Sequence, residues 1–412
     1  MDGREGRGVV RRAGTRSIGG MADDVPPDVP GDDPFSALPL FGDLAKALSG
    51  QGPLNWDAAR QFAHLGATGG SAEHNVDPAL RATYADLARI AGMHVNDVTG
   101  LETSFPEPSL VTRGQWAQAT LEAYRPLFTE LATSLGGTAP GDDDDSIDPM
   151  ARMMAGLSKM MAPAMLGMTV GAMVGTLAQR VFGLHDLPIP RERSEIVLVP
   201  GNIDAFAEQW SITIDEMRLW VLAHELAGHV VLSAPHLRGS LTDLIRRHVG
   251  AFRPDPGAVA DKLAGLETAG GDPLEVLQEA FSDPELLLGA VRSPDQEALA
   301  PALDAAVATV VGYTDWVVDA VAARVVGGDA LTIAEAVRRQ RVEASPDDLF
   351  VERLLGIRLG DEQVRRGKQF VQGVVDRAGE AGLELLVTSP NAMPTANEVD
   401  APGLWLARVK DE

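Results

Sequence analysis

Residues Asp215–Ser233 read DEMRLWVLAHELAGHVVLS, and this stretch decides the predicted fold. Thr213, followed three residues later by Glu216, has the pattern of a capping box, which predicts that a helix begins here. Apolar residues lie nearly all round this helix, so it is predicted to be buried. His224 and Glu225 interrupt the apolar run. Because burying a carboxylate without a partner is costly, we expect Glu225 to have a specific partner or function.

A zinc-peptidase helix is the first interpretation of this pair. In the motif H-E-x-x-H, two histidines four positions apart bind zinc and the glutamate activates the metal-bound water. Here His224 and His229 are five positions apart. On a regular α-helix four steps bring residues within about 40° of each other, whereas five steps separate them by about 140°.

A local change in the helix could restore the facing of the two rings. A single-turn π-bulge absorbs one extra residue, and Gly228 is where we expect it, because glycine tolerates unusual backbone angles. Two interpretations therefore stay open. One is a zinc helix with a one-residue insertion; the other is a decayed zinc helix whose histidines are merely satisfied in a core.

The composition restricts the class of protein. The chain has 412 residues, of which 45% are hydrophobic, so it can build a substantial core. Its net charge of −24 argues against nucleic acid and anionic membrane surfaces as partners. It contains no cysteine, so disulfides and thiolate ligands are excluded and a cytoplasmic location is expected. Any metal would have to use His, Asp or Glu.

The chain divides into three parts by composition. Residues 1–33 are expected to be a disordered N-terminal extension. Residues 34–149 form a predicted N-terminal helical region that ends in an acidic linker with four consecutive aspartates, and residues 150–412 form the main helical domain. The expected helices of the N-terminal region are Asn55–Ala67, with Asn55 as its cap, Asp77–Ala91 and Pro106–Leu135, the last broken at Gly114 and Pro126; a further short helix is expected at 33–49. The clearest strand is Glu195–Pro200.

The segment Met160–Ala178 is uncharged and long enough to span a bilayer. It consists mostly of Gly, Ala and Met, and Gly167, Gly171 and Gly175 recur at every fourth position. We favour a buried helix over a membrane span, with the glycines letting another helix pack closely.

A second apolar helix is predicted at Pro301–Val326. Asp315 and Asp319 are four apart and share one face of it, which suggests a buried carboxylate pair with a cation, a metal or hydrogen-bond donors. The alternative is a pair of surface acids matched by arginines such as Arg324.

The C-terminal part is basic on an otherwise acidic chain. Its cationic residues either form a solvated face or dock onto the acid-rich body, and they are Arg338, Arg339, Arg341, Arg365, Arg366 and Lys368. The proline-punctuated tail is expected to wrap the surface, with Trp405 as its anchor.

Taken together, several segments resemble an actinobacterial family of zincin-like, zinc-dependent metallopeptidases. Some members of that family are described only as hydrolases or are linked to deazaflavin-cofactor biosynthesis. The resemblance covers nearly everything after residue 34. The segments that carry the resemblance are GPLNWDAARQFA (Gly52–Ala63), LVPGNIDAFAEQW (Leu198–Trp210), LWVLAHELAGHVVLSAPHLR (Leu219–Arg238), VGYTDWVVDAV (Val311–Val321), LLGIRLGDEQVRRGKQFV (Leu354–Val371) and NAMPTANEVDAPGLWLARV (Asn391–Val409).

The resemblance implies a mainly α, zincin-like fold with few short strands, centred on residues 150–412. In such a site one helix supplies two histidine ligands and the general base. Carried over to this chain, His224 matches the first ligand and Glu225 the base. The second ligand position falls on Gly228 by strict spacing, or on His229 if the helix bulges.

The later helix of such a site carries the pattern E-x-x-x-D. Here Val311 stands where the glutamate ligand would be, and Asp315 is retained. The resemblance gives Asp315 the role of orienting a ligand histidine, or of serving as a ligand itself if the helix shifts. The implied metal is zinc, with His224, His229 and Asp315 as its candidate ligands.

Two functions follow. The first is a zinc metallopeptidase-like hydrolase, in which a metal-activated water attacks a peptide or amide carbonyl of a peptide or protein substrate and Glu225 takes the proton. The second is a catalytically degenerate zincin-fold protein with a binding or regulatory role. The departures at Gly228 and Val311 motivate the second.

Overall fold

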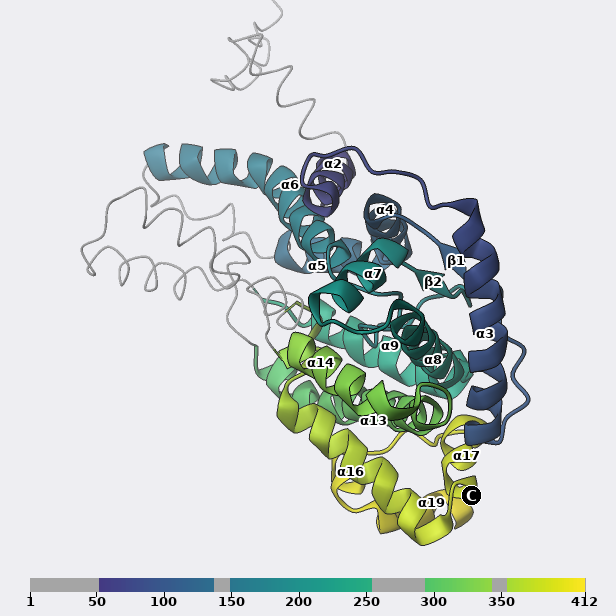
Figure 1. Ribbon diagram of the computed structural model, residues 1–412. Coiled ribbons are helices and arrows are strands. Elements are labelled where there is room, and N and C mark those ends of the chain that lie inside the picture. Colours follow the sequence, from purple (N-terminus) through teal and green to yellow (C-terminus); the bar gives the residue numbers. More distant parts are fainter. Residues whose placement is uncertain (1–51, 137–148, 254–292, 343–353, 412) are drawn as a thin grey trace, which may run out of the picture. The chain divides into compact units, whose positions relative to one another are not determined.

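The computed structural model describes residues 52–136, 149–253, 293–342 and 354–411 (Figure 1). All of them belong to one compact unit, Ala47–Glu412. The predicted N-terminal extension, the short helix at 33–49 and the acidic linker lie outside the described residues.

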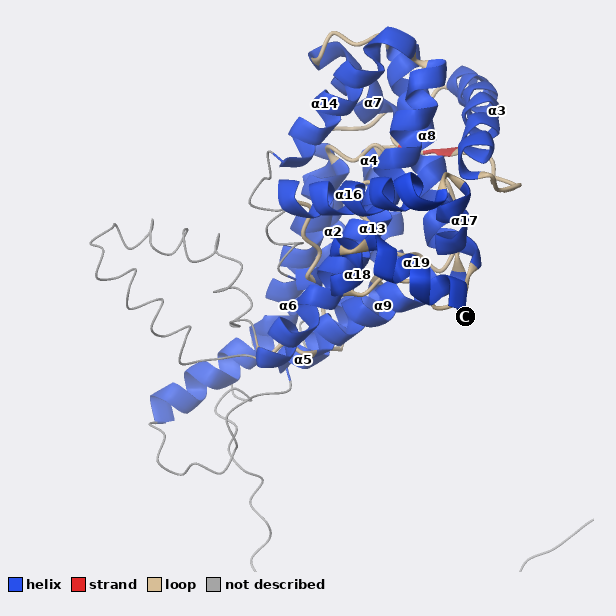
Figure 2. Ribbon diagram, turned by 90° about the horizontal axis from the view of Figure 1, so that it is seen from below, coloured by secondary structure: helices blue, strands red, loops and turns tan. Residues whose placement is uncertain are grey.

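The fold is mainly helical, as predicted (Figure 2). The two strands among the described residues are only two residues long, and β1 (Ser109–Leu110) pairs in parallel with β2 (Val197–Leu198). The α-helices of the described residues are α2 (Trp56–Thr68), α3 (Pro78–Thr99), α4 (Arg113–Ala123), α5 (Arg125–Gly136), α6 (Pro149–Ala178), α7 (Pro200–Gln209), α8 (Ile214–Ser233), α9 (Pro235–Gly250), α13 (Pro294–Val325), α14 (Ala330–Val342), α16 (Asp361–Ala378), α17 (Ala381–Thr388), α18 (Ala396–Asp400) and α19 (Pro402–Asp411).

Helix α8 lies at the centre of the packing. It contacts α3, α7, α9 and α13, and α13 in turn packs along α16 (Figure 1). Almost every residue of α8 from Met217 onward is buried, because apolar side chains cover all of its faces. A helix enclosed in this way fixes the positions of its few polar side chains.

Close packing of α2 on α6 follows from the glycines of α6. A Cβ atom added at Gly171 would lie 2.3 Å from the carbonyl oxygen of Ala59, and one at Gly175 would lie 2.7 Å from that of Ala63. The backbones of the two helices therefore approach so closely that no side chain fits at these positions, and the predicted role of these glycines is confirmed. By length and composition α6 (over Met161–Ala178) and α13 could each cross a membrane, but 44% and 83% of these stretches, respectively, are buried within the fold.

Two local predictions fail. Thr213 does precede α8, but its side chain makes no capping hydrogen bond, so the capping box is absent. The helix is held by burial of its faces rather than by its cap.

Residues 106–112 are not helical. Pro106 and Pro108 disfavour the helical conformation in the residues before them, and β1 follows instead. Helix α4 begins with a capping box formed by Thr112 and Gln115, and the break between α4 and α5 falls at Tyr124. Gly114 lies inside α4.

Candidate functional site

Helix α8 runs without a break from Ile214 to Ser233, and it has no π-bulge. Gly228 is an ordinary buried residue of this helix. The predicted adjustment that would bring His224 and His229 onto one face is therefore wrong. With five regular steps between them, the two side chains leave the helix in directions about 140° apart.

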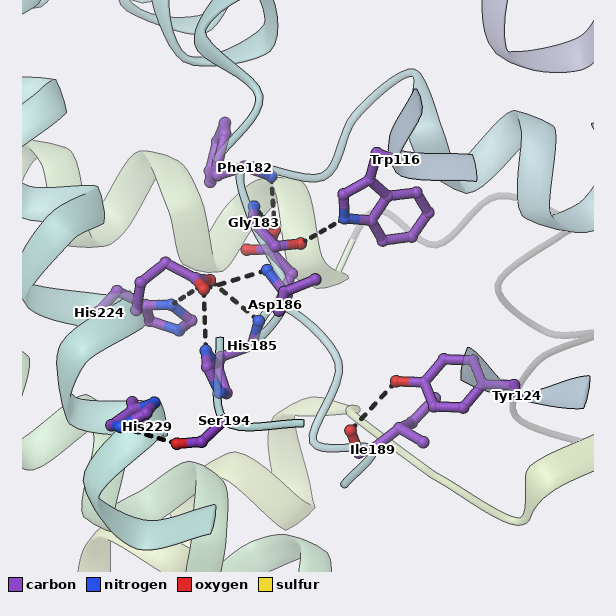
Figure 3. A network of polar contacts seen from close by, with 12 residues as sticks. Trp116, Tyr124, Phe182, Gly183, His185, Asp186, Ile189, Ser194, His224 and His229 are labelled. Atoms are coloured by element: carbon purple, nitrogen blue, oxygen red, sulfur yellow. Dashed lines mark hydrogen bonds and ion pairs between the residues drawn. The ribbon is translucent and has the colours of Figure 1, made fainter. Parts of the chain in front are cut away.

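The two histidines accordingly have different neighbours. The ring of His224 stacks on that of Trp220, with ring centroids 5.6 Å apart and an interplanar angle of 14°. The ring of His229 lies 5.9 Å from that of Phe105, and its Nε2 is 3.3 Å from the hydroxyl of Ser194 (Figure 3).

Glu225 has a complete set of partners and no exposed surface. The backbone N–H groups of Leu184 and His185 donate to its carboxylate at 3.1 and 2.9 Å. The Nδ1 atom of His185 lies 2.8 Å from the same carboxylate (Figure 3). A buried carboxylate needs hydrogen-bond donors or a cation, and residues of one short loop provide them for Glu225.

His185 is the residue that the sequence analysis missed. It belongs to the loop Gly183–Asp186, hereafter the 183–186 loop, which lies between α6 and β2. A Cβ atom added at Gly228 would lie 2.6 Å from the Cβ of His185. Glycine at 228 therefore leaves the space that the His185 side chain occupies. The only sequence signal was a histidine in a turn-rich segment, and nothing in that segment pointed to α8.

The rest of the loop is fastened on both sides. The N–H groups of Phe182 and Gly183 donate to the Asp186 carboxylate, and the indole N–H of Trp116 donates to the Gly183 carbonyl at 2.9 Å (Figure 3). A Cβ atom at Gly183 would lie 2.3 Å from the carboxyl carbon of Glu225. The backbone of the loop thus lies directly against the glutamate side chain.

Burial and neighbouring charges set the protonation states here. Burial raises the pKa of Asp186 and lowers that of His224, which keeps His224 neutral at pH 7. Burial also lowers the pKa of His229, to about 4. For Glu225 burial acts to raise the pKa, but His185 and the N–H donors outweigh it and the pKa is lowered. The glutamate is therefore an ionised hydrogen-bond acceptor.

Asp315 is engaged by an arginine. Its carboxylate lies 3.2 Å from the guanidinium of Arg341, and both side chains are largely buried. Asp319, one turn later, binds Arg338 at 2.9 Å and Lys368 at 2.6 Å. The sequence did not identify the cationic partners of Asp315 and Asp319. In the structure these partners are basic residues of the C-terminal part, which dock onto the acidic body, and Arg324 is not among them.

The positions that strict spacing assigns to zinc ligands do converge in space. His224, Gly228 and Val311 all line one small cavity of about 10 Å³, together with His185 and Asp315. The three positions therefore lie around one cavity, and two of them, Gly228 and Val311, carry no metal-binding side chain.

The side chains that are present do not fit zinc. His224 and His229 point into different neighbourhoods, Asp315 is bound to Arg341, and Glu225 is enclosed by the 183–186 loop. Across the described ranges, no group of three or more His, Asp or Glu side chains is arranged to hold a metal ion. The structure does not bring the three predicted ligands together.

Comparisons with known proteins show a family match and a similar fold. The family model described as "Zincin-like metallopeptidase" matches residues 54–406, which include every residue of this site. A solved structure described as "a putative hydrolase with a novel fold", from Chloroflexus aurantiacus, superposes with a TM-score of 0.61 at 20% sequence identity, covering 87% of this chain and 99% of the other. At that identity the likeness concerns the fold alone. No curated protein matches the sequence significantly.

Proposed function

We propose that this chain, which belongs to the zincin-like metallopeptidase family, is a binding or regulatory protein that keeps the family's scaffold and has given up its zinc chemistry. The observation that carries the proposal is the enclosure of Glu225. A general base must reach the water that it activates, whereas the hydrogen bonds of this buried carboxylate, within the part of the chain that the structure describes, all come from the 183–186 loop.

The contacts of Glu225 support this proposal, because the loop supplies the stabilisation that a metal site would otherwise provide. A zinc ion and its water would neutralise and solvate a carboxylate such as Glu225. Here two N–H groups and the His185 ring do so, and the side chain of His185 fills the space beside Gly228. In this proposal, α8 serves to hold the 183–186 loop in place.

A peptide or amide hydrolase is the second candidate, and family membership supports it. His224 and Glu225 keep the residue types of the first ligand and the base. The deazaflavin link and an actinobacterial origin, both implied by the sequence words, stay predictions. A cytoplasmic location is also proposed, supported by the lack of cysteine.

Metal analysis and a hydrolysis assay on the purified full chain decide between the two. We expect far less than one zinc ion per chain after incubation with zinc and removal of the excess. We also expect no cleavage of a fluorogenic peptide library above a buffer blank. Glu225→Gln should destabilise the fold by about 3 kcal/mol, because a buried carboxylate loses its charge while its donors remain.

The matched control is Glu122→Gln, which makes the same chemical change at an exposed position. Cleavage is compared at a temperature where circular dichroism shows both variants to be folded. One bound zinc per chain, together with cleavage that persists in Glu122→Gln and disappears in Glu225→Gln, would establish the hydrolase and overturn the binding role.

A further inference from the structure

A cavity of about 580 Å³ lies apart from α8, among the end of α4, the start of α5, the segment 189–192 and α9. This volume falls within the range of small-molecule sites in proteins, about 300–1,000 Å³. Its wall is preformed, since the hydroxyl of Tyr124 donates to the carbonyl of Ile189 at 3.1 Å and so ties two of its sides together (Figure 3).

One part of the wall is apolar. Tyr124, Leu127, Ile189 and Ile245 line it, and all four are buried within the fold. Such a surface accepts a compact apolar or aromatic group and removes it from water.

Three arginines supply the polar part. Arg246 is held by Glu130 at 3.0 Å. Arg191 lies with its guanidinium 4.9 Å from the centre of the Tyr124 ring and donates to the hydroxyl of Thr120 at 2.8 Å. Its Nε atom is buried and has no hydrogen-bond partner.

Arg238 has no carboxylate partner among the residues that the structure describes, and Arg191 has none there either. In a chain with 59 acidic and 35 basic residues such a pairing is easily available. Other half-buried arginines have one: Arg218 pairs with Asp204 and Arg338 with Asp319. The two acidic residues of the cavity wall, Glu192 and Asp243, are exposed and leave the three arginines in excess.

We propose that this cavity binds a small organic carboxylate with an apolar body, the carboxylate bridging Arg191 and Arg238 and the body lying on the wall around Leu127 and Ile245. Guanidinium groups bind carboxylates through paired, charge-assisted hydrogen bonds, and a partly desolvated arginine without a carboxylate partner favours such a ligand. This inference rests on the proposed binding role, since it names the ligand class for it.

Calorimetry with 2-naphthoate and its neutral analogue 2-naphthamide tests the proposal on the full chain. The two probes share their ring system and differ in charge. We expect 2-naphthoate to bind at one site and at least about tenfold more tightly. Arg238→Gln should weaken 2-naphthoate by about 10–100-fold and leave 2-naphthamide nearly unchanged, because it removes a hydrogen bond between charged groups.

Two further variants make the result specific. Gly239→Trp should abolish binding of both probes, because Gly239 lines the cavity and has open space around its Cβ position. Arg89→Gln, a change on α3 at an exposed arginine, should leave both affinities unchanged. Equal affinity for the two probes, an absence of binding, or 2-naphthoate binding that survives Arg238→Gln would each overturn the proposal. The zinc and hydrolysis assays are separate measurements, so failure of this inference is distinguishable from failure of the proposed function.

Discussion

At the scale of single residues, Gly228 governs how closely the 183–186 loop approaches α8. The strict spacing of the zinc motif places the second ligand at Gly228, which has no side chain to bind a metal. In the structure, the side chain of His185 occupies the space beside this glycine. Glu225 then bonds to the same loop. Gly228 and Glu225, on consecutive turns of α8, thus hold the 183–186 loop against this helix.

Gly228→Ala tests this account. Alanine in a helix interior is normally favoured over glycine by about 1 kcal/mol. Here the added Cβ would lie 2.6 Å from the Cβ of His185, so we expect a net loss of about 1–3 kcal/mol in the free energy of unfolding, measured by urea denaturation. Gly239→Ala on α9 is the control, because its Cβ would meet no atom within 4 Å, and it should be neutral or stabilising. Equal stabilisation by both changes would contradict the close contact.

At the scale of elements, glycine decides how α2 and α6 pack. The repeat Gly167, Gly171, Gly175 runs along the face of α6 that meets the backbone of α2. A Cβ at Gly167 or Gly171 would lie 2.3 Å from a carbonyl oxygen of the N-terminal part of α2 or its cap. Backbone cannot rotate away as a side chain can, so the contact between these helices depends on the absence of side chains there.

Gly171→Val should therefore separate the two helices. We expect a loss of about 3 kcal/mol in the free energy of unfolding, since overpacking against backbone has no easy relaxation. Ala172→Val introduces the same side chain at the next residue of α6, which is exposed, and should change the stability by only a few tenths of a kcal/mol. Chemical denaturation of the two variants side by side is the measurement; similar losses would show that the glycine face is not what α2 packs on.

At the scale of the whole molecule, the net charge is −24, and basic residues of the C-terminal part pair with particular acidic residues of the core. Arg338, Arg341 and Lys368 dock on Asp315 and Asp319 of α13. Trp405, fully buried, anchors the tail by donating its indole N–H to the carbonyl of Ala392 at 2.7 Å. The C-terminal part is thereby fixed to the core: of the two alternatives that the sequence left open, these three cations take docking rather than a solvated face, and Trp405 is the anchor that the sequence predicted.

Buried neutral histidines should make the stability of the molecule fall in mild acid. The pKa of His229 is about 4 in the folded chain because of burial, against an ordinary value of 6.5 in the unfolded chain. Between pH 6.5 and 4 the unfolded state binds more protons, so the free energy of unfolding decreases as the pH is lowered through this window. His224, whose pKa burial also lowers, adds to the same trend.

The melting temperature recorded from pH 7 to 4 measures this effect. His229→Gln should make the decrease smaller, whereas His74→Gln, at an exposed position, should leave it unchanged. An NMR titration in which the His229 ring protonates near pH 6.5 would remove the basis of this prediction.

The helical class, the cap of α2 at Asn55, the close-packing glycines of α6 and the need of Glu225 for a partner can all be predicted from the amino-acid sequence. These features depend on neighbours along the chain or on helical periodicity, so they are readable from one sequence. The identity of that partner depends on how distant parts of the chain pack together. His185 lies 40 residues before Glu225, and its position is set by how the 183–186 loop seats against α8. The same holds for the regular course of α8 at Gly228: a bulge and an unbroken helix have the same sequence, and packing against His185 selects the unbroken one.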